Sequence, residues 1–205
     1  MLYPNLISKR FILAYKSPRR LELVRGLELE PEVIVRDIDE SYPPSVMGAA
    51  VAEYVTRVKA TAFTDILGVN DVIITGDTVV LLDDEILEKP SNNEEATFML
   101  RKLSGRSHLV ASGVAVTTLR DGKPETSCEV DTCEVTFDEL TEDMISHYLD
   151  AYKPFDKAGS YGVQDLIGFI GVSSIHGSFY TVMGLPVHNL HRMLQELKYN
   201  LNRLD

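Results

Sequence analysis

The 205-residue sequence has only two cysteines, Cys128 and Cys133, and their spacing is neither that of a CxxC pair nor that of a zinc knuckle. Thiols placed in this way are typical of a reducing compartment. No run approaches the about 18 apolar residues that a membrane helix needs. The apolar run FILAY is too short for a signal peptide, and charge follows it at once. These absences predict a cytoplasmic protein with no membrane partner.

Several motifs of well-known enzyme classes are also missing. The sequence contains no GxxxxGK[ST], GxGxxG, HExxH or GxSxG pattern, which argues at the motif level against P-loop, dinucleotide-binding, zincin and serine-hydrolase enzymes. No internal repeat, low-complexity segment or long linker divides the chain. Its length therefore predicts a single domain over residues 1–205, with room for two lobes around one cleft.

Positive charge is in short supply. Lys and Arg number 20 against 31 Asp and Glu, so the formal net charge is −11. A nucleic-acid-binding surface is usually basic, and this balance argues against such a partner. It does not argue against a small anionic ligand in a local basic pocket.

The order of patterns alternates between strand and helix. Apolar runs predict strands at residues 11–14, 33–39 and 71–82, the last broken by Gly76-Asp77, with a short return strand ending at Pro90. Helical spacing predicts helices from residue 18, over 47–67, from a capping box at 91–94 to Gly105, around 144–149, and after Pro186. A hairpin is predicted from 108–120 and 125–137, and short strands and turns over 155–182. Hairpins within such an alternation favour a mixed α/β fold over a purely parallel sheet.

The first candidate site is the turn Ser17-Pro18-Arg19-Arg20. Ser17 suits an N-cap and Pro18 suits the first helical position. Two arginines follow, although the first turn of a helix favours anionic side chains. The same positions suit the binding of a polyphosphate, because free N–H groups and forked guanidiniums both bind phosphate oxygens. Solvated arginines paired with nearby acids are an equally good explanation from the spacing alone.

A second candidate is the carboxylate of Asp77 within an otherwise apolar strand. Burying it unpaired would cost several kcal/mol, about the scale known for isolated charges. It is therefore expected either to end the strand at a solvated cleft or to meet a cation. The acidic group Asp37, Asp39 and Glu40 is a weaker candidate: its oxygens suit Mg²⁺ or Mn²⁺, but acidic turns are usually only solvated.

The segment Asp156–Gln164, DKAGSYGVQ, is a further candidate. Its small residues allow close approach of the backbone to a ligand, with Lys157 and Gln164 toward its two ends. A β-turn without a ligand is the competing interpretation.

Taken together, seven blocks resemble one family: FILAYKSPRRLEL, VRDIDE, ITGDTVV, EILEKP, MLRKLSGRSH, DKAGSYGVQ and GLPV. They are similar to the blocks of the Maf family of nucleotide pyrophosphatases, in the family's order, over about residues 10–187. The resemblance implies a mixed, twisted β-sheet flanked by helices, with two lobes around a nucleotide-binding cleft as in inosine triphosphate pyrophosphatases. It also implies hydrolysis of a nucleoside triphosphate between the α- and β-phosphates, a divalent metal cofactor (Mg²⁺ or Mn²⁺), and commonly a homodimer.

The resemblance also implies roles for individual residues. Arg19, Thr78 and Gln164 match the branch that acts on dTTP and UTP, and Arg19 and Gln164 are expected to contact the pyrimidine. Asp77 falls at the position of the proton acceptor, and Glu40 and Lys89 match positions in the catalytic cleft. From these positions we expect Asp77 and Glu40 to hold the metal together. Further phosphate contacts are expected from Ser17, Arg20, Lys59 and Lys157.

Two positions depart from the family pattern: Tyr15 stands where Ser is usual, and Asp165 stands where Gly usually follows Gln164. The first could remove a hydroxyl near the phosphates, and the second could alter the base pocket. A nucleotide-binding regulator of cell division or septum formation, with little turnover, is the alternative function, because binding and hydrolysis would use the same cleft. An RNA-related role is disfavoured by the charge of −11.

Overall fold

The computed structural model describes residues 3, 6–15 and 17–201, the last four of them without side chains. Their seven strands form one mixed sheet in the order β2-β1-β3-β5-β6-β7, with β4 paired to β3. The strands are β1 (Arg10–Leu13), β2 (Glu32–Val33), β3 (Asp71–Leu82), β4 (Glu85–Leu87), β5 (Ser107–Arg120), β6 (Lys123–Phe137) and β7 (Val172–His176). The helices are α1 (Pro18–Arg25), α2 (Ala50–Thr61), η2 (Thr64–Ile66), α3 (Asn93–Leu103), α4 (Glu142–Tyr152), η3 (Ala158–Ser160), α5 (Leu166–Gly171), α6 (Phe179–Met183) and α7 (Val187–Leu201). The mixed α/β fold with a sheet flanked by helices is confirmed.

One edge of β3 is left open in its middle. On that edge β1 runs parallel to β3 as far as Ile74, and β4 pairs antiparallel from Val80 onward. On the other edge β5 pairs continuously from Ile73 to Leu81. Within the described residues no strand covers the first edge between Ile74 and Val80. Side chains from both faces of the sheet can therefore reach this gap.

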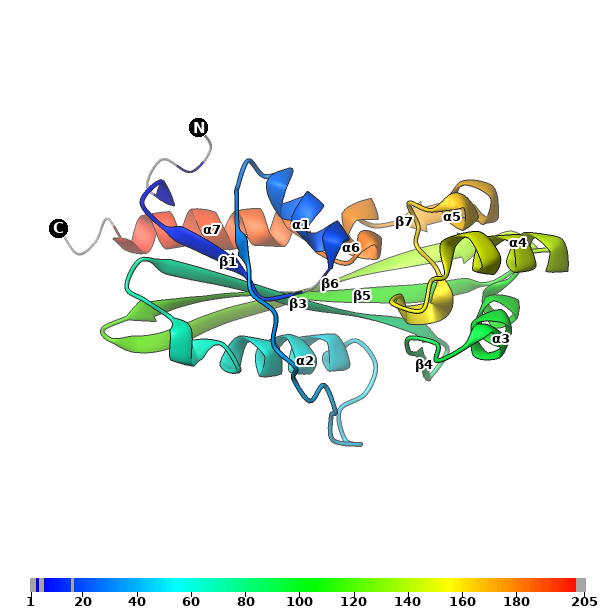
Figure 1. Cartoon of the computed structure of the whole chain (residues 1–205), viewed down its shortest axis with the longest axis horizontal. Coiled ribbons are helices and arrows are strands. Elements are labelled where there is room, and N and C mark those ends of the chain that lie inside the picture. The colour runs from blue at the N-terminus through cyan, green and yellow to red at the C-terminus, as the bar shows by residue number, and fades with distance from the viewer. Residues whose placement is uncertain (1–2, 4–5, 16, 202–205) are drawn as a thin grey trace.

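Helices cover both faces of the sheet, as Figure 1 shows: α2 lies on one face, and α1, α6 and α7 lie on the other. Alternation along β3 sorts its side chains between them. Val79 and Leu81 belong to the apolar cluster under α2, whereas Val80 and Leu82 belong to the larger core shared with the opposite helices. By the same alternation, Asp77 faces α2 and Thr78 faces α1.

A glycine brings α2 unusually close to the sheet. Gly113 on β5 pairs with Asp77, and a Cβ at Gly113 would lie 2.4 Å from Thr56 Oγ1 and 2.8 Å from the Ala52 carbonyl oxygen. Ala52, Thr56 and Lys59 share one face of α2, at the spacing of one and two helical turns. The close approach therefore sets Lys59 of α2 beside Asp77 of β3.

Four predicted features differ from the structure. The helix predicted over 47–67 is the shorter α2, which ends at Thr61 and is followed by the separate 3₁₀ turn η2. The strand predicted over 33–39 is limited to the two residues of β2, because Arg36 instead turns to pair with Asp65 at 2.6 Å. The segment 155–182 forms the helices α5 and α6 with one strand, β7, rather than several short strands. The cap of α3 is Asn92, whose side chain accepts from the Glu95 N–H at 2.9 Å, one residue later than predicted.

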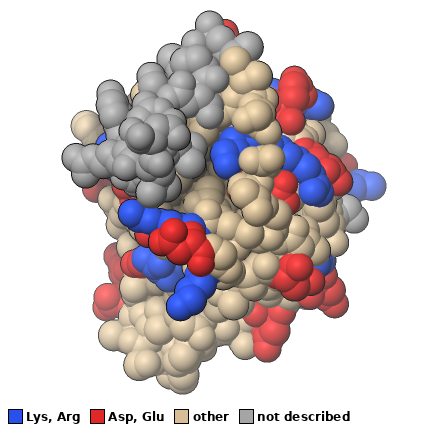
Figure 2. All heavy atoms as spheres, turned by 90° about the vertical axis from the view of Figure 1, so that its left-hand side faces the viewer, with Lys and Arg blue, Asp and Glu red and all other residues tan. Residues whose placement is uncertain are grey.

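The hairpin predicted from 108–120 and 125–137 is confirmed as β5 and β6, and it is the longest pairing of the sheet. No helix in the described part of the chain is both long and apolar enough to cross a membrane. On the face seen in Figure 2, acidic and basic side chains lie interspersed over the described residues.

Candidate active site

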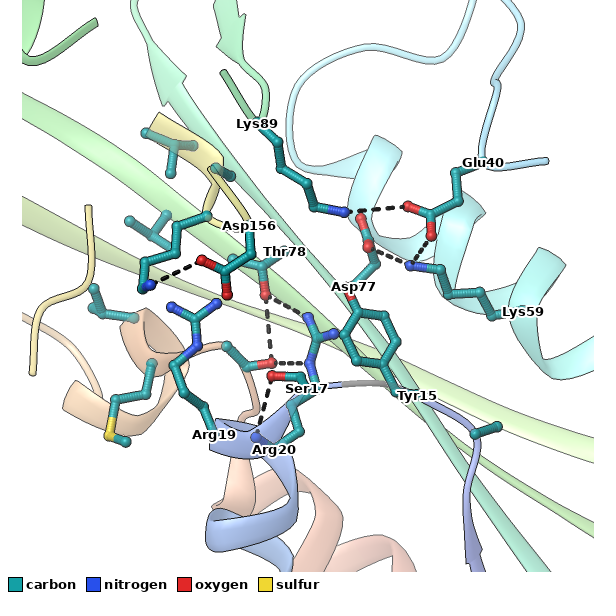
Figure 3. A pocket seen from close by; sticks show the side chains of 18 of the residues that line it. Tyr15, Ser17, Arg19, Arg20, Glu40, Lys59, Asp77, Thr78, Lys89 and Asp156 are labelled. Atoms are coloured by element: carbon teal, nitrogen blue, oxygen red, sulfur yellow. Dashed lines mark hydrogen bonds and ion pairs between the residues drawn. The ribbon is translucent and has the colours of Figure 1, made fainter. Parts of the chain in front are cut away.

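A cavity of about 300 Å³ opens at the gap in β3. Nine of the ten predicted site residues line it: Ser17, Arg19, Arg20, Glu40, Lys59, Asp77, Thr78, Lys89 and Lys157. The tenth, Gln164, is not among the lining residues. Figure 3 shows that the labelled side chains come from the loop after β1, from α1 and α2, from β3, and from the segments around Glu40, Lys89 and Asp156.

Asp77 meets a cation instead of ending its strand. β3 continues for five residues beyond it, and its carboxylate, on a side chain only 11% exposed, accepts from Lys59 Nζ at 2.7 Å. The same ammonium lies 2.9 Å from Glu40 Oε1, and Lys59 is itself only 2% exposed in its side chain. Among the described residues, Asp77 Oδ2 has no hydrogen-bond donor. One buried ammonium thus holds two carboxylates together at the cavity wall (Figure 3).

Arg20 is buried and its guanidinium is already engaged. Its Nε–H donates to the Gly184 carbonyl oxygen at 2.7 Å, and its Nη2 donates to Thr78 Oγ1 at 3.0 Å. Ser17 caps α1 as predicted, with its Oγ accepting from the Arg20 N–H at 3.4 Å. Arg20 therefore joins α1 to the turn at Gly184 and fixes the Thr78 hydroxyl, which also bonds Ser112 Oγ at 2.8 Å.

Tyr15, one of the two departures from the family pattern, lies against two cations. Its ring centroid is 4.0 Å from Arg20 Cζ and 4.7 Å from Lys59 Nζ. Contacts of this kind stabilise a cation by the quadrupole of the ring. The positive charge of Arg20, and then that of Lys59, lowers the pKa of the Tyr15 phenol against the opposing effect of burial.

The opposite wall of the cavity carries Asp156 and Lys157, on the loop between α4 and η3. Asp156 Oδ1 accepts from Lys157 Nζ at 2.8 Å, and the Arg19 guanidinium is turned toward the same carboxylate (Figure 3). Burial lowers the pKa of Arg19, and Asp156 opposes that change. Partial burial would raise the pKa of Asp156, but the hydrogen bond from Lys157 and the charges of Lys157 and Arg19 hold it below its ordinary value.

A glycine also sets the position of this loop. Gly159 has φ +67°, and a Cβ there would lie 3.0 Å from Val80 Cγ1. Its N–H donates to the Glu88 carbonyl oxygen at 3.1 Å. Because Gly159 allows this close approach to β3, the residues just before it line the cavity.

The second departure, Asp165, lies behind this wall. Its Oδ2 accepts from the Tyr148 hydroxyl at 3.0 Å and is 3.8 Å from Lys157 Nζ. Lys157 is therefore held between two carboxylates, those of Asp156 and Asp165. Gln164 next to it has a buried Oε1 with no hydrogen-bond partner among the described residues.

A buried aromatic cluster supports the cavity floor at Tyr161. The Tyr161 hydroxyl bonds His108 Nε2 at 2.7 Å, and Phe137 packs against both rings with centroids 5.0 and 5.6 Å away. Burial lowers the pKa of His108 to about 4. The imidazole is therefore neutral at neutral pH and acts as part of the packed core.

Sequence reasoning missed Asp156, Tyr161 and Gly184 as lining residues. Asp156 belonged to a block that was noticed, DKAGSYGVQ, but only the lysine and glutamine in it received a role. Gly184 opens the block GLPV, but it received no role because its carbonyl contributes through the backbone.

The cavity can bind an anionic ligand of moderate size. Cationic side chains approach it from several elements, and two carboxylates held by Lys59 face the same space. A polyphosphate with a neutral, hydrogen-bonding group attached suits this combination, because the cations bind phosphate oxygens and the remaining polar groups can orient the rest.

The sequence is similar to proteins of one family over nearly its whole length. The family model described as "Maf-like protein" matches residues 10–197. The dTTP/UTP pyrophosphatase of Bacteroides thetaiotaomicron is 47% identical over 94% of this chain and 98% of its own length. Those of Parabacteroides distasonis and Flavobacterium psychrophilum are 45% and 41% identical, each over 95% of this chain and 98% and 97% of their own lengths. A solved dITP/XTP pyrophosphatase from Mycobacterium abscessus is a distant likeness, with a TM-score of 0.43 and 16% identity over 92% of this chain and 98% of that chain. By the family match and by these identities over nearly the whole length, the chain belongs to the Maf family.

Proposed function

We propose that this protein hydrolyses dTTP and UTP between the α- and β-phosphates. Water adds to phosphorus, the bond to the bridging oxygen breaks, and the nucleoside monophosphate and pyrophosphate are released. The observation that carries the proposal is the pair Asp77 and Glu40, held by one buried ammonium at the wall of a cation-rich cavity. The names of the relatives, dTTP/UTP pyrophosphatases at 41–47% identity, support the substrate class.

The two carboxylates fit a divalent metal. Hard oxygen ligands suit Mg²⁺ and Mn²⁺, which proteins often bind through one or two carboxylates together with substrate phosphates. Asp77 Oδ2 is not used by any hydrogen bond of the described residues, and no group of three or more His, Cys, Asp or Glu among them could hold a metal by itself. Asp77 and Glu40 would therefore hold the metal together with the substrate. Bound there, it would supply charge to stabilise the phosphates and to acidify a water molecule.

The remaining residues divide between binding and positioning. Lys59 aligns Asp77 and Glu40, and Asp77 is the proposed acceptor of the proton from the attacking water. Lys89, whose ammonium lies 3.8 Å from Glu40, offsets the charge that develops on the leaving pyrophosphate. Arg20, predicted as a phosphate contact, acts mainly by holding Thr78 and the turn at Gly184.

The test is release of pyrophosphate from a panel of nucleoside triphosphates, with Mg²⁺ or Mn²⁺ and after chelation by EDTA. We expect turnover of dTTP and UTP well above that of GTP and ATP, loss of turnover in EDTA, and recovery on adding metal. Modified pyrimidine nucleotides such as 5-methyl-UTP belong in the panel because the two-carbonyl edge of the base is unchanged in them. Binding of dTTP and UTP without pyrophosphate release would contradict the proposal.

The homodimer implied by the family is likewise a proposal. Analytical ultracentrifugation of the full chain, with and without UTP, measures it directly.

A further inference from the structure

The side chains expected to read the base do not all face the cavity. Thr78 lines it, but its hydroxyl is already shared with Arg20 and Ser112. Gln164 is not among the lining residues. Of the three positions expected to select the base, only Arg19 brings a polar group to the cavity that no hydrogen bond of the described residues engages. Another residue must complete the recognition.

Asp156, toward which the Arg19 guanidinium is turned, could do so. Its carboxylate lies between two donors: Lys157 Nζ, which bonds it at 2.8 Å, and the guanidinium of Arg19, which is turned toward it (Figure 3). Its side chain is 64% exposed, whereas that of Lys157 is 13% exposed. The carboxylate oxygens therefore remain open to a ligand, while the lysine is held in place by Asp156 and Asp165. Along this wall the order of groups is donor, acceptor, donor.

The pyrimidines of dTTP and UTP carry the complementary order. Their Watson–Crick edge presents two carbonyl oxygens with one N3–H between them, which is acceptor, donor, acceptor. Cytosine presents an amino group, an unprotonated N3 and a carbonyl, so an acceptor faces an acceptor at the central position. A carboxylate is acceptor-only, and it therefore rejects cytosine by leaving two lone pairs opposed.

We infer that Asp156 is a specificity-determining residue that accepts the N3–H of uracil or thymine, with Arg19 and Lys157 donating to the two flanking carbonyls. This inference rests on the proposed function, and it moves Lys157 from the phosphates to the base. It also gives Asp165 a positioning role, since its carboxylate holds Lys157 from the far side. The selection against cytosine would then come from one carboxylate on a loop.

The first test removes the proposed hydrogen bond in two ways, by methylating N3 of the base and by replacing Asp156. Rates of pyrophosphate release from UTP and from N3-methyl-UTP are compared for the wild type and for Asp156→Ala. For each protein, the effect of N3-methylation is the ratio of kcat/KM for UTP to kcat/KM for N3-methyl-UTP. This ratio should be about tenfold or more larger in the wild type than in Asp156→Ala, because only the wild type has a carboxylate whose hydrogen bond methylation removes. Equal effects of methylation in the two proteins would overturn the inference.

The second test changes the hydrogen-bonding character and keeps the size. Asp156→Asn offers an amino group to the unprotonated N3 of cytosine, so the ratio of kcat/KM for UTP over CTP should fall about tenfold or more. The matched control is Asp84→Asn, an exposed carboxylate on the turn between β3 and β4, which should leave the ratio unchanged. An unchanged ratio in Asp156→Asn would contradict the assignment.

Failure of the inference and failure of the proposed function are distinguishable. A wild type that releases no pyrophosphate from any triphosphate contradicts the function itself. A wild type that turns over UTP, but whose preference over CTP survives in Asp156→Asn and in Asp156→Ala, contradicts only the role of Asp156. Unchanged thermal unfolding of both variants would separate a change in selection from a loss of fold.

Discussion

The two walls of the cavity use the same kinds of side chain in opposite order. At β3 one ammonium, Lys59, lies between the carboxylates of Asp77 and Glu40. At the loop before η3 one carboxylate, Asp156, lies between the cations of Lys157 and Arg19. The central charge of the first wall, the Lys59 ammonium, is buried, although Glu40 beside it is 42% exposed; the central charge of the second wall, the Asp156 carboxylate, is 64% exposed. The order and burial of charges, more than their number, separate a wall suited to phosphate chemistry from a wall suited to recognition.

The largest expected effect is on the buried wall. Asp77→Asn removes the proposed proton acceptor and one charge of the metal pair, and turnover of UTP should fall about 10³-fold, within the range of lost general-base catalysis. The preference for UTP over CTP should change little, since Asp156 remains. Turnover in Asp77→Asn equal to that of the wild type would remove Asp77 from the mechanism.

The second prediction compares stabilities between the walls. Lys59→Met leaves two carboxylates near one another without their shared cation, and the free energy of unfolding should fall by about 3 kcal/mol or more, as for a broken buried ion pair. Lys157→Met at the other wall should cost less, about 1 kcal/mol, because water screens Asp156 and the Tyr148 hydroxyl still donates to Asp165. Urea unfolding of both variants measures the difference, and equal losses would show that the two walls are energetically alike.

The third prediction concerns the support beneath Tyr161. Since burial holds the folded pKa of His108 at about 4, below its ordinary value of 6.5, the unfolded chain binds the proton more readily. The contribution of His108 is fully present above pH 6.5 and is lost as the pH falls toward 4, by about 3 kcal/mol in total. In His108→Gln the free energy of unfolding should fall less steeply over this interval than in the wild type. Parallel pH curves for the two proteins would show that His108 does not titrate in this way.

The smallest expected effect concerns Arg20, which joins α1 to the turn at Gly184 and holds the Thr78 hydroxyl. Arg20→Lys keeps the charge but loses the forked geometry that reaches Gly184 and Thr78 together, and it should cost about 1–2 kcal/mol of stability. Because Thr78 then loses its donor, KM for UTP should rise more than kcat falls. A change confined to kcat would indicate that Arg20 contacts the reacting phosphates, as the sequence-based expectation had it.

Much of this arrangement was predictable from the sequence, for reasons tied to particular residues. The apolar pattern around Asp77 placed it in a strand, and charge burial then required a cation near it. That this cation is Lys59 was not predicted, since the resemblance gave Lys59 only as a phosphate contact. The approach of α2 to Asp77 depends on Gly113, a residue of a different strand. Arg19 and Arg20 stand out in the sequence because cations are unfavourable in the first turn of a helix. In the structure the Arg20 guanidinium donates to Gly184 and Thr78, whereas no hydrogen bond of the described residues engages that of Arg19.

Other features could not be predicted because they depend on tertiary contacts. Residues 33–39 have the composition of a strand, but Arg36 forms an ion pair with Asp65, and within the described residues the segment does not pair with a neighbouring strand beyond Val33. The segment 155–182 mixes glycine with β-branched residues, and its short helices form where it packs against α4 and β6 rather than from local propensity. Asp156 lies in the candidate segment DKAGSYGVQ, but no local pattern gives it a role, since that role depends on Arg19, far away in sequence.

The position of Asp77 in the middle of β3 has a consequence for the order in which the protein loses its activities as it unfolds. β3 is paired continuously with β5 and packs under helices on both faces, so its amide hydrogens that bond to a neighbouring strand are expected to exchange only through global unfolding. The loop that carries Asp156 is more exposed, and we expect it to open locally at a smaller free energy. Under mild denaturant, selection of the base is therefore expected to be lost before hydrolysis is: the protein would become an indiscriminate catalyst before it becomes an inactive one.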